Sequence, residues 1–130
     1  MTAKKKIFLY KLPMIILALS IMYFALTPLP EFPKTIPMFD KIAHLGAFAV
    51  LALLGALPFG PGFGFLVPNA LFQVAYGGLI ELLQSNVPGR QADIVDFIAD
   101  VIGVIIGSGI AVMIVRLKAL KAKGKADCPR

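Results

Sequence analysis

The chain has 130 residues, of which 58% are hydrophobic and only 15% are charged. In a typical soluble domain about a quarter of the residues are charged. The composition therefore argues against a soluble protein and favours one membrane domain, 1–130. The formal net charge is +6, and ten of the thirteen basic residues lie near the ends, four before residue 12 and six after residue 115. Because no aromatic or base-reading element accompanies this charge, we exclude a nucleic acid as a partner.

Four apolar segments follow one another along the chain, at residues 8–26, 42–58, 63–83 and 94–115. A membrane-spanning helix needs about 20 mostly apolar residues, and about 17 at the minimum, so each segment is long enough. Between them lie a proline-rich stretch at 27–39, a tight Gly-Pro-Gly turn at 59–62 and a loop at 85–92. We therefore predict an all-α fold, an integral membrane four-helix bundle with short loops.

The basic ends predict how this bundle is oriented. Four spans place both termini on one side, and the excess of Lys and Arg there predicts the cytoplasmic side of the cell membrane. Residues 27–41 and 85–93 then face outward, and residues 117–130 form a basic cytoplasmic tail that we expect to fray near the lipid headgroups. The alternative is a cleavable N-terminal signal peptide, but the apolar run is long and no clear small-x-small site precedes the proline-rich stretch. Cys128 lies in the tail without a second cysteine to pair with.

Polar residues gather at one end of these segments. They open the second segment, close the third and open the fourth: Asp40, Lys41 and His44, then Glu81 and Gln84, then Arg90, Asp93, Asp96 and Asp100. In the predicted topology all three groups reach the same side of the membrane. Ionisable groups at the edge of the hydrocarbon are costly, so a convergent set is a candidate functional site.

The aspartates of the fourth segment differ in what explains them. Asp93 is well placed to cap the helix, and acids in a first turn complement the helix dipole. These effects account for Asp93 and extend to Asp96. They do not account for Asp100, which lies a further turn into the membrane.

Glycines predict where the helices approach one another. Gly77 and Gly78, one turn before Glu81, allow another helix to come close to the third segment. Gly103 and Gly107 form a small-xxx-small pair in the fourth segment. We expect this pair to serve close packing inside the bundle, with a homodimer interface as the alternative.

Two groups of residues resemble a known family. The first is Asp40-Lys41-Ile42-Ala43-His44, followed by Phe48 and Leu51; the second is Gly78, Glu81 and Gln84, followed by Pro88-Gly89-Arg90, Asp93, Asp96 and Gly103. Their types and spacing are similar to the two signatures of the VanZ-like membrane protein family, over about residues 40–107. Phe48 stands where that family often has Tyr, and Asp100 where it often has Asn. The resemblance implies a small multi-pass protein of the cell envelope, in a family whose namesake is associated with low-level resistance to teicoplanin.

Several chemistries suit the polar cluster. The leading expectation is a site for an anionic or amphiphilic envelope molecule, such as a lipid-linked or peptidoglycan-derived one, in contact with membrane lipid. Three residues are expected to contact the anion: Lys41, His44 and Arg90. Four others are expected to position these three: Glu81, Gln84, Asp96 and Asp100. In this interpretation an arginine clamps a phosphate or carboxylate through two parallel hydrogen bonds.

Two alternatives remain open from the sequence. One is an intramembrane enzyme in which His44 and Glu81 act as base and acid on a lipid-linked substrate, provided that they come within hydrogen-bonding reach. The other is an accessory protein whose charges are all paired internally. His44, Glu81 and an aspartate could also hold a divalent ion, but neither an HExxH motif nor a second histidine supports it, so we predict no metal and no cofactor.

Overall fold

A computed structural model describes residues 3–28, 38–59 and 63–126. Within these ranges the chain forms helices α1 (Ala3–Leu26), α2 (Phe39–Ala56), α3 (Phe63–Gln84) and α4 (Ile94–Ala126), with a single 3-10 turn η1 (Leu57–Phe59) after α2 and no strand. Each of the four helices contains a stretch that is long and apolar enough to cross a membrane. The predicted all-α membrane bundle is therefore confirmed.

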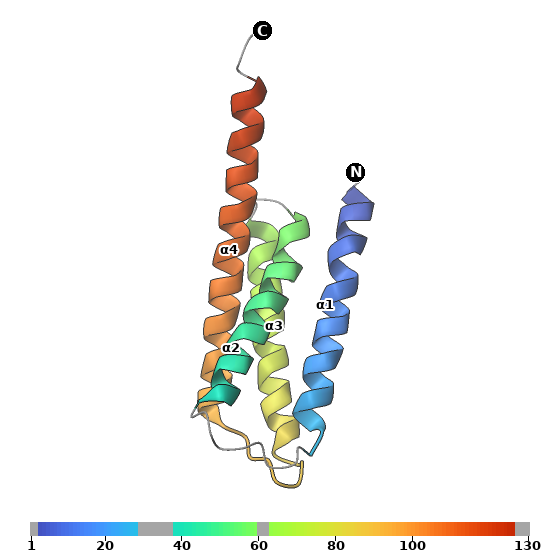
Figure 1. Cartoon of the computed structure of the whole chain (residues 1–130), viewed down its shortest axis with the longest axis vertical. Helices are drawn as coiled ribbons and strands as arrows, with labels where there is room; N and C mark the ends of the chain where they lie inside the picture. The colour runs from blue at the N-terminus through green and yellow to red at the C-terminus, as the bar shows by residue number, and fades with distance from the viewer. Residues whose placement is uncertain (1–2, 29–37, 60–62, 127–130) are drawn as a thin grey trace.

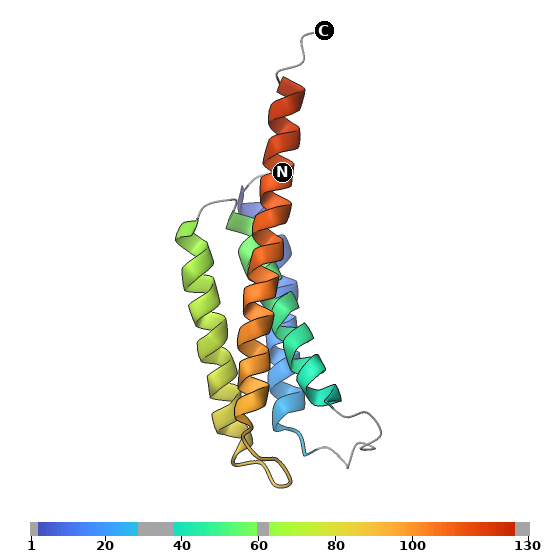
Figure 2. The same cartoon turned by 90° about the vertical axis from the view of Figure 1, so that its left-hand side faces the viewer.

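The helices alternate in direction, so that the chain passes up and down the bundle (Figures 1 and 2). Both termini lie at one end. The end of α1, the start of α2, the end of α3 and the start of α4 lie at the other end (Figure 1). The three polar groups of the sequence therefore share one end of the bundle, which we call the polar end.

The fourth helix is longer than the apolar segment that predicts it. α4 runs to Ala126, whereas the predicted span ends at residue 115 and the residues from 117 were expected to fray. Alanines and lysines are strong helix formers, and Lys123 and Lys125 lie in the last turn, where positive charge complements the helix dipole. The tail thus continues α4 as a helix. The stretches 29–37 and 60–62 and the end of the tail with Cys128 lie outside the described residues.

Two glycines allow α2 and α4 to pack closely against each other. A methyl group added at Gly103 would collide with the backbone oxygen of Leu45, and one added at Gly107 would collide with that of Ala49. The two backbones can come this close only because neither glycine has a side chain. The expected packing inside the bundle is present, and a homodimer through the same pair would require α2 to leave α4.

A small apolar core lies next to the polar end. Phe48, Ala52, Ile80 and Val104 are buried together, and Ala25 joins them from α1. Phe48 is fully enclosed, one turn beyond His44 on α2, and its ring lies 6.1 Å from that of Tyr76. The many apolar side chains that point away from this core, on α1 above all, face the surroundings, where lipid takes the place of a protein core.

The close contact between α2 and α4 predicts an effect of one methyl group. We expect Gly107→Ala to lower the free energy of unfolding by about 1–3 kcal/mol, because the new carbon meets backbone atoms that cannot move aside. Gly109→Ala is the matched control, since nothing lies within 4 Å of its added carbon. Thermal unfolding of the purified protein in detergent measures both. Equal midpoints for the two variants would contradict this account of the packing.

Candidate functional site

The polar end contains two sets of side chains. The first, which we call the outer network, consists of Lys41, Asp93 and Asp96 and lies at the starts of α2 and α4. The second, which we call the inner triad, consists of His44, Glu81 and Asp100 and draws one residue from each of α2, α3 and α4. The two sets differ in how completely their polar atoms are satisfied.

Lys41 is at the centre of the outer network. Its Nζ donates to Asp93 Oδ2 at 2.8 Å and to Asp96 Oδ1 at 2.9 Å, and it lies 3.7 Å from Asp40 Oδ2. One ammonium group therefore bridges the first residues of α2 and α4. Both of its short contacts are charge-assisted hydrogen bonds, which are stronger than neutral ones.

Asp93 joins three helices at one point. Its Oδ1 accepts a hydrogen bond from the Val95 backbone N–H at 2.8 Å, which confirms that Asp93 caps α4. Its own backbone N–H donates to Glu81 Oε2 at 2.9 Å, so that the end of α3 is tied to the start of α4. The side-chain bond to Lys41 adds α2.

Arg90 is held by the end of α1 and by α3. Its Nη2 donates to the backbone oxygen of Phe24 at 3.0 Å, and this carbonyl belongs to the last turn of α1, where such groups lack partners within the helix. The Gln84 amide has two orientations. In one, its nitrogen donates to Ala25 O at 3.3 Å. In the other, its nitrogen donates to Glu81 Oε1 at 3.3 Å and its oxygen accepts from Arg90 Nη1 at 3.1 Å. We assign the second, because it gives both charged neighbours a partner of the right kind.

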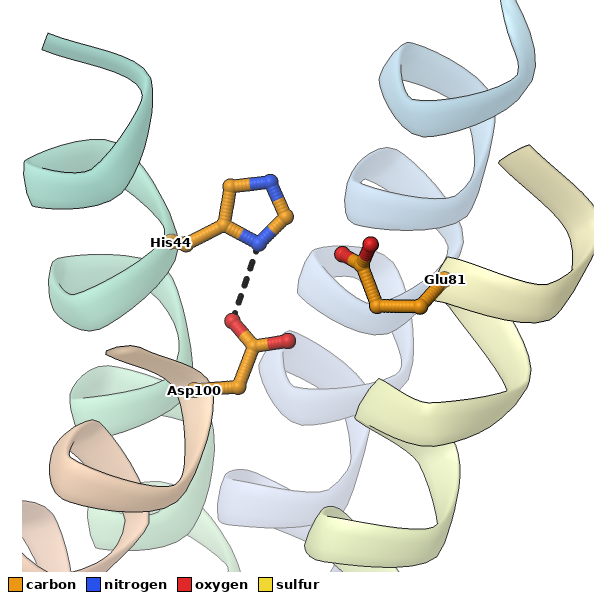
Figure 3. Close-up of side chains that lie close together, drawn as sticks. All are labelled: His44, Glu81 and Asp100. Carbon is orange, nitrogen blue, oxygen red and sulfur yellow. Dashed lines mark hydrogen bonds and ion pairs between the residues drawn. The ribbon is translucent and has the colours of Figure 1, made fainter. Parts of the chain in front are cut away.

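The inner triad is more deeply buried. His44 Nδ1 and Asp100 Oδ1 are 2.9 Å apart, and the Asp100 side chain is 0% exposed. The Glu81 carboxylate points toward this pair from α3 (Figure 3). One nitrogen or oxygen of each of the three residues lies within 4.8 Å of those of the other two. Because a carboxylate only accepts hydrogen bonds, we assign the proton of the contact to His44 Nδ1, which leaves Nε2 as an acceptor.

Asp100 is enclosed without being fully satisfied. Its Oδ2 is buried and has no hydrogen-bond partner among the described residues. α3 passes this oxygen at Gly77, where an added carbon would lie only 2.9 Å from Oδ2. Of the two glycines expected to allow a close approach, Gly77 is the one that does so, since a carbon added at Gly78 would make an ordinary 3.5 Å contact with Phe97.

The structure shows the internal partners of Lys41 and Arg90. Lys41 and Arg90 were expected to contact an anion, but both donate to internal partners, because the acids that open α4 and the carbonyls that end α1 are the nearest acceptors. Complete internal pairing, the expectation for an accessory protein, is not observed either. Asp100 Oδ2 and Arg90 Nε are without partners in the part of the chain that the structure describes. His44 and Glu81 have ligand atoms within 4.8 Å of each other, so the enzyme alternative stays a prediction.

Two amides on α3 were not singled out from the sequence. Asn69 Nδ2 donates to the backbone oxygen of Ala52 at 3.2 Å, and the almost fully buried Gln73 lies one turn later, with its Nε2 3.5 Å from Asn69 Oδ1. The signal was available, since amides four residues apart in an apolar segment lie on one helical face. Gly77 and Glu81 continue that spacing, so a polar strip runs along α3 to the inner triad.

The outer network predicts a pH dependence. The hydrogen bond from Lys41, and then that from the Val95 N–H, lower the pKa of Asp93 below its ordinary value of 3.8. A carboxyl group with a lowered pKa stabilises the fold above its unfolded pKa, and the contribution is lost as the pH falls through the lowered value. We expect acid to destabilise the wild type more steeply than Asp93→Asn, which keeps a capping side chain but has no charge to lose. Unfolding midpoints measured below about pH 4 test this, with Asp40→Asn as control. Identical pH profiles of wild type and Asp93→Asn would refute it.

Comparison with known proteins identifies a family. No curated protein and no solved structure matches the chain. The model of the family described as VanZ/LLP1 matches residues 8–116, which include the outer network, the inner triad and Arg90. This match confirms the resemblance carried by the residues around His44 and Glu81. The chain belongs to the VanZ/LLP1 family and is a multi-pass membrane protein.

Proposed function

We propose that the protein binds the polar head group of an amphiphilic envelope molecule, lipid-linked or peptidoglycan-derived, at the inner triad. The observation that carries the proposal is the Asp100 carboxylate, which is fully buried beside His44 and Glu81 and has one oxygen without a partner among the described residues. Burying an unsatisfied charged group costs several kcal/mol, and ionisable groups within membrane segments commonly mark binding sites.

The position of the triad fits an amphiphile. It lies near the ends of the spans, about one turn inside the outer network, where the head group of a lipid meets the ends of the helices. The apolar faces of the helices provide a surface for an acyl or prenyl chain. Lys41 and Arg90 contribute by fixing the helix ends, and Gln84 by orienting Glu81.

A reaction at the same site is the second candidate, and a specific observation favours it. His44 and Glu81 lie within reach of one substrate, and Asp100 holds the imidazole through Nδ1. In this mechanism His44 Nε2 accepts the proton of an attacking hydroxyl, and Glu81 in its protonated form donates one to the leaving oxygen. The two candidates differ in the fate of the bound molecule, which a binding protein returns unchanged and an enzyme converts.

Lipids that purify with the protein provide the test. We expect mass spectrometry to find an envelope lipid enriched over the bulk membrane with the wild type, and this enrichment to fall about tenfold in Glu81→Gln and His44→Gln. The fall reflects the loss of a hydrogen bond to a charged group, worth about 1.5–3 kcal/mol.

Asp40→Asn removes a charge at the same end of the bundle from a side chain that is 65% exposed, and serves as the matched control. A lipid profile that is the same for all four proteins at equal expression would rule out binding at the triad. Teicoplanin susceptibility of cells producing these variants extends the test to the resistance associated with the namesake of the family.

We also propose that both termini are cytoplasmic and that the polar end faces outward from the cell membrane. This orientation is supported by ten basic residues near the two termini, four at the start of the chain and six near its C-terminus. Reporter proteins fused after Phe59 and at the C-terminus should both give the signal of a cytoplasmic location. An external signal from either fusion would reverse the orientation and place the triad on the inner side.

A further inference from the structure

The charges of the described residues at the polar end do not balance. Among these residues, five carboxylates lie there, at Asp40, Glu81, Asp93, Asp96 and Asp100, against the two permanent cations Lys41 and Arg90. Lys41 is occupied by Asp93 and Asp96. Arg90 donates to a backbone carbonyl and to the Gln84 amide rather than to a carboxylate. Within the described part of the chain, His44 is therefore the one group beside the buried acids Glu81 and Asp100 that can carry a positive charge.

The donor atoms of the inner triad are those that divalent metal ions bind. Imidazole suits ions such as Zn²⁺, and carboxylates are common ligands of the same ions. His44, Glu81 and Asp100 each offer one such atom, with all three atoms within 4.8 Å of one another. Their helices bring them together from three directions (Figure 3). Three protein ligands and at least one open position are typical of a zinc site that handles a bound molecule.

A second observation, independent of the grouping, points to a missing partner. Asp100 Oδ2 is buried and without a hydrogen bond among the described residues, although the other oxygen of the same carboxylate is satisfied by His44. Glu81 is held in place by the Asp93 N–H and the assigned Gln84 amide, as ligand carboxylates are in known sites. A cation at the triad would supply the partner that Asp100 Oδ2 lacks.

We infer that His44, Glu81 and Asp100 together bind one divalent cation of the Zn²⁺ class. Ligand atoms about 2.0–2.2 Å from a common ion lie roughly 3–4 Å apart, so the widest pair of the triad must close by about 1 Å. Glu81 has the longest side chain of the three, and rotation about its bonds provides this movement when the ion replaces one of its two hydrogen bonds. When the ion binds, the proton of His44 moves from Nδ1 to Nε2, so that Nδ1, the nitrogen beside Asp100, is the ligand. Two carboxylates and this neutral imidazole neutralise a doubly charged ion without an additional anion.

The role of this ion in binding a head group rests on the proposed function. Without a cation, a phosphate at the triad would meet two carboxylates while Lys41 and Arg90 are engaged elsewhere. With a divalent ion, the site carries the positive charge that the two basic side chains do not offer. The ion's open position then accepts a phosphate or hydroxyl oxygen of an envelope lipid.

Metal binding by the full-length protein is the direct test. The protein is purified in detergent without a histidine tag, stripped with EDTA and dialysed separately against ZnCl₂, MnCl₂ or MgCl₂. We expect elemental analysis to find one Zn²⁺ per chain, and thermal unfolding to show a higher midpoint with zinc than without. Loss of a residue that only orients a metal ligand lowers the metal affinity about 10–100-fold. Asp100→Asn, Glu81→Gln and His44→Gln each remove a ligand itself, so each should weaken zinc binding by about 100-fold or more.

Asp40→Asn is again the matched control and should keep its single zinc ion, because Asp40 lies outside the triad. Circular dichroism and gel filtration of the stripped variants establish that any loss of zinc occurs in folded protein. Absence of zinc from the wild type, equal zinc in the triad variants, or equal binding of Mg²⁺ would each overturn the inference.

Lipid analysis with and without EDTA separates this inference from the proposed function. Loss of the enriched lipid on chelation supports both. An enriched lipid in a wild type that binds no zinc would overturn the metal site and leave the proposed function standing. One zinc ion at the triad without any enriched lipid would support the metal site and overturn the proposed function.

Discussion

The buried carboxylate of Asp100 is the constraint on which the rest of the polar end depends. A charged group in an apolar bundle is stable only when other groups are brought to it, since neither lipid nor Phe48 can solvate it. α2 brings His44, and α3 passes at Gly77, the one residue type that leaves room for the carboxylate. The close contact between α2 and α4 at Gly103 and Gly107 maintains this arrangement. The close packing of the helices and the hydrogen bonding of Asp100 therefore depend on each other.

Two basic residues of the polar end have a structural role, although their charge would suit them to bind an anion. Lys41 and Arg90 are the residues that an anion would be expected to seek, yet they connect helix ends. Lys41 binds the acids that open α4, and Arg90 binds a carbonyl in the last turn of α1. Of the acids that remain, Asp100 has an oxygen, Oδ2, without a hydrogen-bond partner among the described residues. In the proposed function, recognition at this end of the bundle therefore depends on the inner triad and not on the two basic residues.

The first helix is attached in a different way from the others. It buries little surface, and its connections run from side chains of the bundle to its backbone oxygens: Tyr76 donates to Ala18 O, and Arg90 to Phe24 O. Carbonyls in the last turn of a helix have no partner within it, so Arg90 serves as a cap and its charge suits the negative end of the dipole. Most of α1 faces lipid, where an apolar side chain needs no protein partner.

The sequence by itself determined the number of spans, the end of the bundle where polar residues meet, the cap at Asp93 and the family. These follow from segment length, hydrophobicity and residue spacing, which are local properties of a chain. Only the tertiary structure decided which charges pair. Lys41 meets its acids 52 and 55 residues away, and His44 meets Asp100 56 residues away. The rotation of each helix about its axis selects such partners, and glycine contacts between helices set that rotation. For the same reason the structure, rather than the sequence, revealed that the two basic residues have internal partners and that one carboxylate oxygen of Asp100 has none in the described part of the chain.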